Sequence, residues 1–251
     1  KLKKFINLKI DLKKIKNIVK TTNFKYLRQL EEKEGFIENK IMGIQNNNKF
    51  FFNKGGEQNF NKDLDQNIVN EIKRNLDIEV GINVLRNDGE SALSIADATK
   101  SSFVRINILS GTMYTDQGII EGKANEIIKL KNTLENKIEI YSDVFVKHAV
   151  PPPGYTIENQ TEELLYRAGA DKIIITGDGT GKEIDYDELK KLREIVPEGR
   201  LVIGSGINES NIKKYQGIAD ILIIGTGFKI DHDVSKQVEF ERVKNLIDKV
   251  E

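Results

Sequence analysis

The chain has 251 residues, a length that fits one (β/α)8 barrel of about 250 residues, and its 39 basic side chains match its 39 acidic ones. This balance leaves no net field that would attract a polyanion, which disfavours nucleic-acid binding. The chain lacks cysteine, so disulfides and thiolate metal sites are excluded, and no apolar run approaches the ~18 residues of a membrane span. We therefore expect a single domain over residues 1–251, a cytoplasmic location and no transmembrane segment.

Short runs rich in Ile and Val alternate with longer segments of helical periodicity along most of the chain. Strands that are apolar throughout are typical of a parallel sheet whose outer face is covered by helices. A short repeat supports this interpretation, because residues 170–175 and 219–224 share the pattern Ala-Asp-x-apolar-apolar-Ile before a glycine-rich loop. The six clearest strands are expected at residues 80–85, 103–108, 138–143, 172–176, 201–203 and 221–224.

Two further units are needed to close an eight-stranded barrel. Residues 41–44 can supply a second strand, but the only candidate for the first strand is 5–10, and helical periodicity follows it at once. The predicted fold is therefore α/β, a (β/α)8 TIM barrel with an irregular or incomplete first βα unit. An open doubly wound sheet is the alternative; it is disfavoured because three successive strands end in glycine loops and none opens with a GxGxxG turn.

Two glycine loops carry the strongest functional signal. Gly204-Ser205-Gly206 follows one expected strand, and Gly225-Thr226-Gly227 follows the next, 21 residues later. In TIM barrels the loops after the last two strands often form a phosphate site, because glycine lets backbone N–H groups approach an anion closely. The alternative is that these glycines only make tight turns. A third loop, with Gly177 and Gly179, is a candidate ligand contact but equally a lid or a plain turn.

A carboxylate, an amine and an imidazole follow the expected strand at 138–143. Asp143, Lys147 and His148 would form a charge-coupled cluster suited to proton transfer or to Schiff-base chemistry, although a plain polar loop has a similar pattern. The polar loop at residues 110–122, which contains Asp116, is a further candidate because such loops often carry binding groups.

Polar residues also end the first two clear strands. Arg86, Asn87 and Asp88 follow the strand at 80–85, and Arg105 and Asn107 lie within the strand at 103–108. A buried arginine is costly unless it is paired, so a structural ion pair with an acidic residue such as Asp143 or Glu139 is the alternative to substrate binding. Nothing in the sequence points to a particular cofactor.

Several of these segments together resemble the BtpA family, also called BtpA/SgcQ, of the ribulose-phosphate-binding barrel type. The resemblance covers residues 80–243 and rests on residues 81–88, 103–107, 115–122 and 143–149, on Ser205-Gly206, and on Gly225-Thr226 with Lys229. It implies a phosphate-binding barrel without an agreed reaction, in a family that includes a cyanobacterial protein tied to photosystem I assembly and bacterial members in sugar-utilisation gene groups. A phosphorylated sugar or nucleoside would suit such a site.

The chain departs from the family pattern near its start. Members usually open with a strand that runs into a His and a Pro-Leu-Pro-Gly turn, and their second strand usually ends Glu-Asn-x-Gly-Asp-x-Pro-Phe; here residues 44–51 lack both acidic groups. Two functions therefore stay open, an enzyme acting on a phosphorylated sugar or nucleoside and a ligand-sensing or assembly protein that lost catalysis. Pairing of two copies as a homo-oligomer is one way to cover the edges that an incomplete first unit would expose.

Overall fold

The computed structural model describes residues 66–115, 118–147, 149–177 and 183–250. The strands expected at 5–10 and 41–44 lie outside these residues, as do Asp116, His148 and Gly179.

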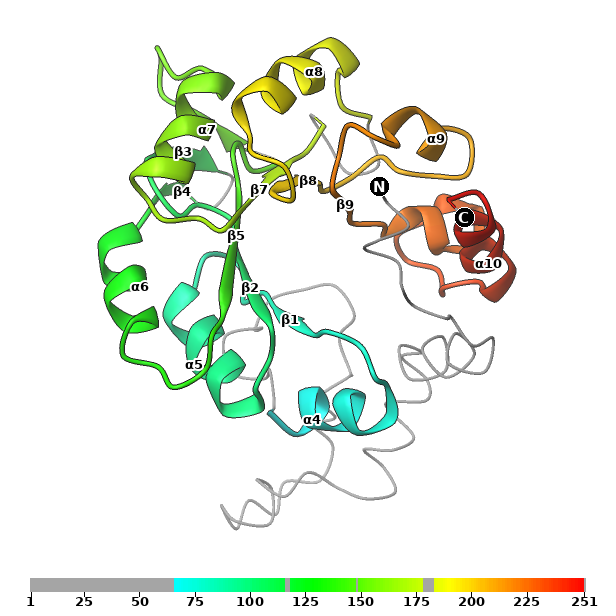
Figure 1. Ribbon diagram of the computed structural model, residues 1–251, viewed down its shortest axis with the longest axis horizontal. Coiled ribbons are helices and arrows are strands. Elements are labelled where there is room, and N and C mark those ends of the chain that lie inside the picture. The colour runs from blue at the N-terminus through cyan, green and yellow to red at the C-terminus, as the bar shows by residue number, and fades with distance from the viewer. Residues whose placement is uncertain (1–65, 116–117, 148, 178–182, 251) are drawn as a thin grey trace.

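Within these residues, six parallel strands form one sheet in which the spatial order equals the chain order. They are β1 (Gly81–Ile82), β2 (Phe103–Ile106), β5 (Glu139–Asp143), β7 (Lys172–Ile175), β8 (Leu201–Ile203) and β9 (Ile221–Leu222). All six strands predicted from the sequence are confirmed; β8 has the predicted bounds and the other five are shorter. Figure 1 shows the sheet curling through the middle of the molecule with the helices around its outside, which is the arrangement of an α/β barrel.

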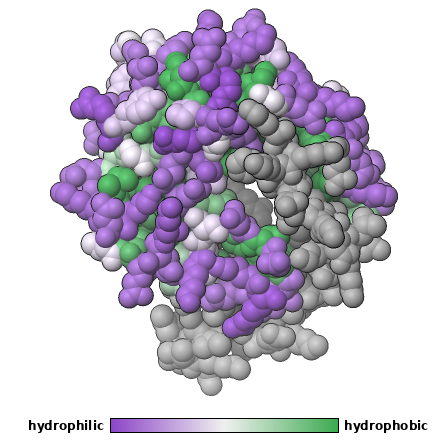
Figure 2. All heavy atoms as spheres, in the orientation of Figure 1, coloured by the Kyte–Doolittle hydropathy of each residue, from purple (hydrophilic) through white to green (hydrophobic). Residues whose placement is uncertain are grey.

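Helix α4 (Gln66–Asn75) precedes β1, and a helix separates each strand of the parallel sheet from the next. The other described helices are α5 (Gly89–Thr99), α6 (Ala124–Lys131), α7 (Ile157–Tyr166), α8 (Tyr186–Ile195), α9 (Ile212–Tyr215) and α10 (Phe240–Asp248), with single 3₁₀ turns η4 (Thr226–Phe228) and η5 (Ile230–His232) before the last one. None of the helices in the described part of the chain is long and apolar enough to cross a membrane. The space-filling view shows hydrophilic side chains over much of the outer surface and a hollow near its centre (Figure 2).

Both faces of the sheet are covered, which explains why its strands are apolar without alternation. The larger core lies between sheet and helices and contains Leu93, Ile140 and Leu189, among others. A smaller cluster lies on the inner face, where Tyr141 packs with Ile174 and Val202. Phe103 stacks on Tyr141 there, with ring centroids 4.3 Å apart. Because side chains two residues apart on a strand share a face, Arg105 and Asp143 also point inward, nearer the carboxyl ends of their strands.

A second, antiparallel sheet is built from loops of the barrel. It has the order β4-β3-β6, with β3 (Thr112–Thr115), β4 (Gly118–Glu121) and β6 (Ala149–Val150). The segment 110–122, interpreted from its polarity as a loop, is therefore largely a hairpin. Alternation explains the difference, because Met113 is buried in a small cluster with Ile108 and Val146 while its polar neighbours face outward.

Candidate functional site

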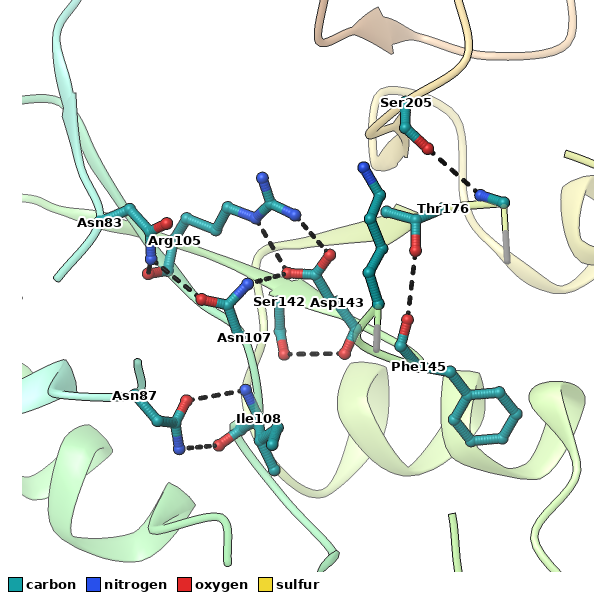
Figure 3. Close-up of polar contacts among 12 residues, drawn as sticks. Asn83, Asn87, Arg105, Asn107, Ile108, Ser142, Asp143, Phe145, Thr176 and Ser205 are labelled. Carbon is teal, nitrogen blue, oxygen red and sulfur yellow. Dashed lines mark hydrogen bonds and ion pairs between the residues drawn. The ribbon is translucent and has the colours of Figure 1, made fainter. Parts of the chain in front are cut away.

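The carboxyl ends of the six parallel strands meet at one end of the sheet, and the candidate residues gather there. Figure 3 shows side chains from β1, β2 and β5 pointing toward one another, with Thr176 and Ser205 from the next strands beside them. The structure thus brings together Arg86, Asn87, Arg105, Asn107, Asp143, Lys147, Gly177 and the two glycine loops after β8 and β9.

Asp143 and Arg105 form a bidentate ion pair across neighbouring strands. Arg105 Nε donates to Asp143 Oδ2 over 2.9 Å, and Arg105 Nη2 donates to Asp143 Oδ1 over 2.6 Å. The Asp143 side chain is 0% exposed, whereas the Arg105 side chain is 23% exposed. The guanidinium therefore covers the carboxylate, and it is the positive partner that is accessible. The pairing of Arg105 with Asp143 that the sequence left open is confirmed.

Two asparagines complete this pair. Asn107 Nδ2 donates to Asp143 Oδ2 over 3.0 Å, so both carboxylate oxygens are occupied. Asn83 Nδ2 in turn donates to Asn107 Oδ1 over 3.1 Å and to the carbonyl of Arg105 over 2.9 Å. Asn83 was not among the candidate site residues. A polar residue two positions before the end of an otherwise apolar strand was the available signal, because it shares the inward face with the strand's end.

Burial is the main cause of the shifted pKa of Asp143 and of Lys147 in this cluster. Complete burial raises the pKa of Asp143, while hydrogen bonds from Arg105 and Asn107 and the charges of Arg105 and Lys147 oppose that rise. Burial is also the main cause that lowers the pKa of Lys147; the charge of Arg105 lowers it further, and Asp143 works against both. A lysine with a lowered pKa at the mouth of a barrel is a group that can exchange a proton nearer neutral pH.

The residues after β1 hold loops together. Asn87 makes two hydrogen bonds with the backbone of Ile108, donating to its carbonyl and accepting from its N–H, each over 2.8 Å. Arg86 Nη2 donates to the carbonyl of Lys147 over 3.4 Å. Asp88 caps α5, where it accepts from the N–H of Ser91 over 2.9 Å and from its hydroxyl over 2.7 Å. Through these contacts, residues 86–88 stabilise the loops at the end of the sheet. The substrate-binding role expected from the sequence stays a prediction.

The glycine loops after β8 and β9 touch each other. A Cβ on Gly227 would overlap the carbonyl oxygen of Ile207, which lies just after the other loop. A Cβ on Gly204 would lie 2.6 Å from Ile174 Cγ2, and Gly206 has φ +77°, a conformation that favours glycine. Within the part of the chain that the structure describes, no acceptor is hydrogen-bonded to the N–H groups of Ser205, Gly206, Gly225, Thr226 and Gly227.

Neighbouring side chains fix the shape of the loop after β8. The buried Asn211 donates to the carbonyl of Gly206 over 2.7 Å and to Glu183 Oε1 over 2.8 Å, and it accepts from the N–H of Asn208 over 2.9 Å. Ser205 is also buried, and its hydroxyl accepts from the N–H of Gly177 over 3.3 Å. Asn211 was missed as a site residue because its contacts are made by a side chain that reaches back from the start of a four-residue helix.

Among the described residues, no group of three or more His, Asp or Glu side chains is arranged to hold a metal ion. The polar groups that these residues bring to the site are instead amides, hydroxyls, the paired carboxylate of Asp143 and the cations Arg86, Arg105 and Lys147.

The barrel is similar to solved structures of another protein. It superposes on N-(5'-phosphoribosyl)anthranilate isomerase from Pyrococcus furiosus with a TM-score of 0.50 and 13% identity, over 74% of this chain and 80% of that one. The Thermococcus kodakaraensis protein of the same name gives a TM-score of 0.50 and 13% identity, over 78% and 85% of the two chains. At 13% identity, this structural similarity is evidence for the fold alone, and it confirms the TIM-barrel fold.

Sequence relatives are closer. An uncharacterized protein of Methanocaldococcus jannaschii is 42% identical over 172 residues, which are 68% of this chain and 65% of that protein. The photosystem I biogenesis protein BtpA of Synechocystis is 36% identical over 169 residues, 67% of this chain and 59% of that protein. The matched region thus spans less than two thirds of the length of these relatives. The family model of the BtpA family matches residues 47–251, and the chain belongs to the BtpA family.

Proposed function

We propose that the protein binds a phosphorylated small molecule, a sugar or nucleoside phosphate, at the carboxyl ends of its strands, with the phosphate against the loops after β8 and β9. The observation that carries this proposal is the group of backbone N–H donors in Ser205, Gly206, Gly225 and Thr226 that have no acceptor among the described residues. Ser205 is buried and Gly206 and Thr226 are half-buried, whereas Gly225 is exposed. Because buried N–H groups are nearly always paired, adjacent unpaired donors in two touching loops suit an anion.

The energetics are favourable for a phosphate ester. A hydrogen bond to a charged oxygen contributes about 1.5–3 kcal/mol, so three such bonds suffice for millimolar or better affinity, which needs about 4 kcal/mol. The loops are already held in place by Asn211 and by the close approach of Gly227 to Ile207, so little ordering of the backbone opposes binding. The hydroxyl of Thr226 offers a further donor.

The remainder of the ligand would face the cluster of Arg105, Asp143 and Lys147. In a catalytic version of this proposal, Lys147 is the group that exchanges a proton with the ligand or attacks its carbonyl, because its lowered pKa makes the neutral amine available. Asp143 would act through Arg105, since hydrogen bonds within the protein already occupy both of its oxygens.

A second candidate function is binding without turnover, as a sensor or an assembly factor. The name of the Synechocystis relative, a photosystem I biogenesis protein, favours it. Incubation with a panel of sugar phosphates and nucleotides, followed by chromatography of the mixtures, distinguishes the two. Conversion of any member supports the enzyme, and binding without conversion across the panel supports the second function.

Titration calorimetry with D-ribose 5-phosphate tests the phosphate site. Gly206→Asp places a side chain and a negative charge among the free N–H groups, and we expect it to abolish binding. Gly217→Asp is the matched control. Gly217 has nearly the same backbone conformation as Gly206, with φ +83° against +77°, and a Cβ there meets nothing within 4 Å. Gly217 precedes β9, at the opposite end of the sheet, so its variant should bind like the wild type. Unchanged affinity in a folded Gly206→Asp protein would mean that these glycines only turn the chain.

A further inference from the structure

Arg105 uses only part of its guanidinium group to hold Asp143. Nε and Nη2 donate to the two carboxylate oxygens, and Nη1 donates to no acceptor in any part of the chain that the structure describes. Figure 3 shows the third nitrogen of Arg105 pointing away from Asp143. Because the carboxylate is fully covered and the guanidinium is not, this N–H group is the part of the ion pair that a ligand can reach.

Lys147 is a second cation, and its ammonium group has no acceptor among the described residues. Within the described residues its ammonium group makes no hydrogen bond and no ion pair, although the side chain is half-buried. Lys147 lies four residues after Asp143, the ion-pair partner of Arg105, so both positive groups lie at the same end of β5. The charge of Arg105 lowers the pKa of Lys147. Among the described residues, the carboxylate near them is that of Asp143, which already has three donors. Arg105, Lys147 and Asp143 together carry a net charge of about +1 when Lys147 is protonated. The guanidinium of Arg86, which donates to the carbonyl of Lys147, is a further positive group at this rim.

We propose that Arg105 and Lys147 bind a carboxylate of the ligand, so that the ligand is a phosphorylated sugar acid whose phosphate lies on the loops after β8 and β9. The inference rests on the proposed phosphate site and adds the chemistry of the ligand's other end. A carboxylate matches the local charge of one unit, and its two oxygens accept one N–H each from the guanidinium and the ammonium group. A second phosphate would bring up to two negative charges to the same two donors.

The spacing of the strands sets the length of such a ligand. Lys147 follows β5, the phosphate loops follow β8 and β9, and β7 alone separates β5 from β8. Neighbouring strands lie about 4.8 Å apart, so Lys147 and the loop after β8, the nearer of the two phosphate loops, are about 10 Å apart along the sheet. A five-carbon acyclic chain with a phosphate at one end and a carboxylate at the other is therefore the probe of choice.

Two probes of equal length isolate the carboxylate. D-ribonate 5-phosphate carries it, and D-ribitol 5-phosphate carries a CH₂OH group in its place. In titration calorimetry we expect ribonate 5-phosphate to bind at least about tenfold more tightly, because a charge-assisted hydrogen bond is worth that factor or more. Lys147→Met should clearly reduce this preference, to the part that Arg105 supplies, with Lys147→Gln as a second uncharged variant. Lys147→Arg should keep most of it.

Lys129→Met is the matched control, since Lys129 is exposed on α6 and its loss changes the net charge by the same amount. It should keep the full preference, which excludes a long-range effect of charge. Circular dichroism confirms that each variant is folded.

The outcomes separate the two proposals. Equal affinities for the two probes, both weakened by Gly206→Asp, overturn the carboxylate site and support the phosphate site. A preference for ribonate 5-phosphate that is as large in both uncharged variants of Lys147 as in the wild type overturns the assignment to Lys147. Binding of ribonate 5-phosphate that Gly206→Asp leaves unchanged supports the cation pair and overturns the phosphate site. Failure of both probes to bind overturns both proposals.

Discussion

Gly227 and Ile207 belong to loops after different strands, yet there is no room for a Cβ between the α-carbon of Gly227 and the carbonyl oxygen of Ile207. Gly227→Ala must therefore push the two loops apart. Overpacking of this kind costs about 1–3 kcal/mol, and it should also weaken phosphate-ester binding because the N–H donors no longer converge. Urea unfolding and calorimetry measure the two effects.

Gly225→Ala is the control for that variant. Gly225 lies two residues earlier in the same loop, and a Cβ there meets nothing within 4 Å. Its φ is −107°, so alanine brings no strain of the left-handed kind. Its stability should be within about 0.5 kcal/mol of the wild type. Equal stability of the two alanine variants would contradict the close approach of the loops.

The buried ion pair predicts a strongly non-additive response to substitution. Asp143→Asn removes the charge that compensates Arg105, and breaking a buried pair in this way costs about 3–5 kcal/mol. Replacing both residues, as in Arg105→Met with Asp143→Leu, should cost less than the sum of the two single changes. A double-mutant cycle measured by urea unfolding gives the coupling energy, and a coupling near zero would mean that the pair is not formed in solution.

The lowered pKa of Lys147 predicts how stability changes with pH. In the unfolded chain the pKa of lysine is about 10.4, so between the lower folded value and ~10.4 the unfolded state binds more protons than the folded state. The free energy of unfolding therefore rises with pH across that window. Below the window, lysine is protonated in both states, and burial of its charge lowers the free energy of unfolding by an amount that does not depend on pH. The difference in unfolding free energy between the wild type and Lys147→Met should grow in favour of the wild type as the pH rises toward 10.

A pH-independent difference would contradict this prediction. Lys129→Met again serves as the control, because it removes an exposed lysine of α6. Its difference from the wild type should stay flat over the same range.

The strands and the end of the sheet that carries the site could be predicted from the sequence, because both depend on local patterns. β7, β8 and β9 consist mainly of Ile, Leu and Val, and glycine or polar residues come soon after each of them. The pairing of Arg105 with Asp143 could be foreseen as an alternative, since a charged side chain on an inward face needs a partner.

Contacts between distant segments could not be predicted in the same way. The antiparallel pairing of β3 with β6 joins residues about 35 positions apart, and nothing in a two-residue strand such as Ala149–Val150 specifies its partner. The same holds for Asn211 and Glu183, which meet only because α9 begins where the loop before α8 passes. Ligand binding and catalysis by the site residues stay predictions.

Asp88 offers a test of whether the segment after β1 binds ligand or only supports the fold. Its carboxylate accepts from the N–H and the hydroxyl of Ser91 at the start of α5, and a lost N-cap costs about 0.5–2 kcal/mol. We expect Asp88→Ala to show this loss in urea unfolding while the affinity for D-ribose 5-phosphate stays within about twofold, a difference of only ~0.4 kcal/mol. Thr156→Ala is the comparison, because Thr156 caps α7 through the N–H of Asn159. A large loss of affinity in Asp88→Ala alone would show that this carboxylate contacts the ligand and that capping is its lesser role.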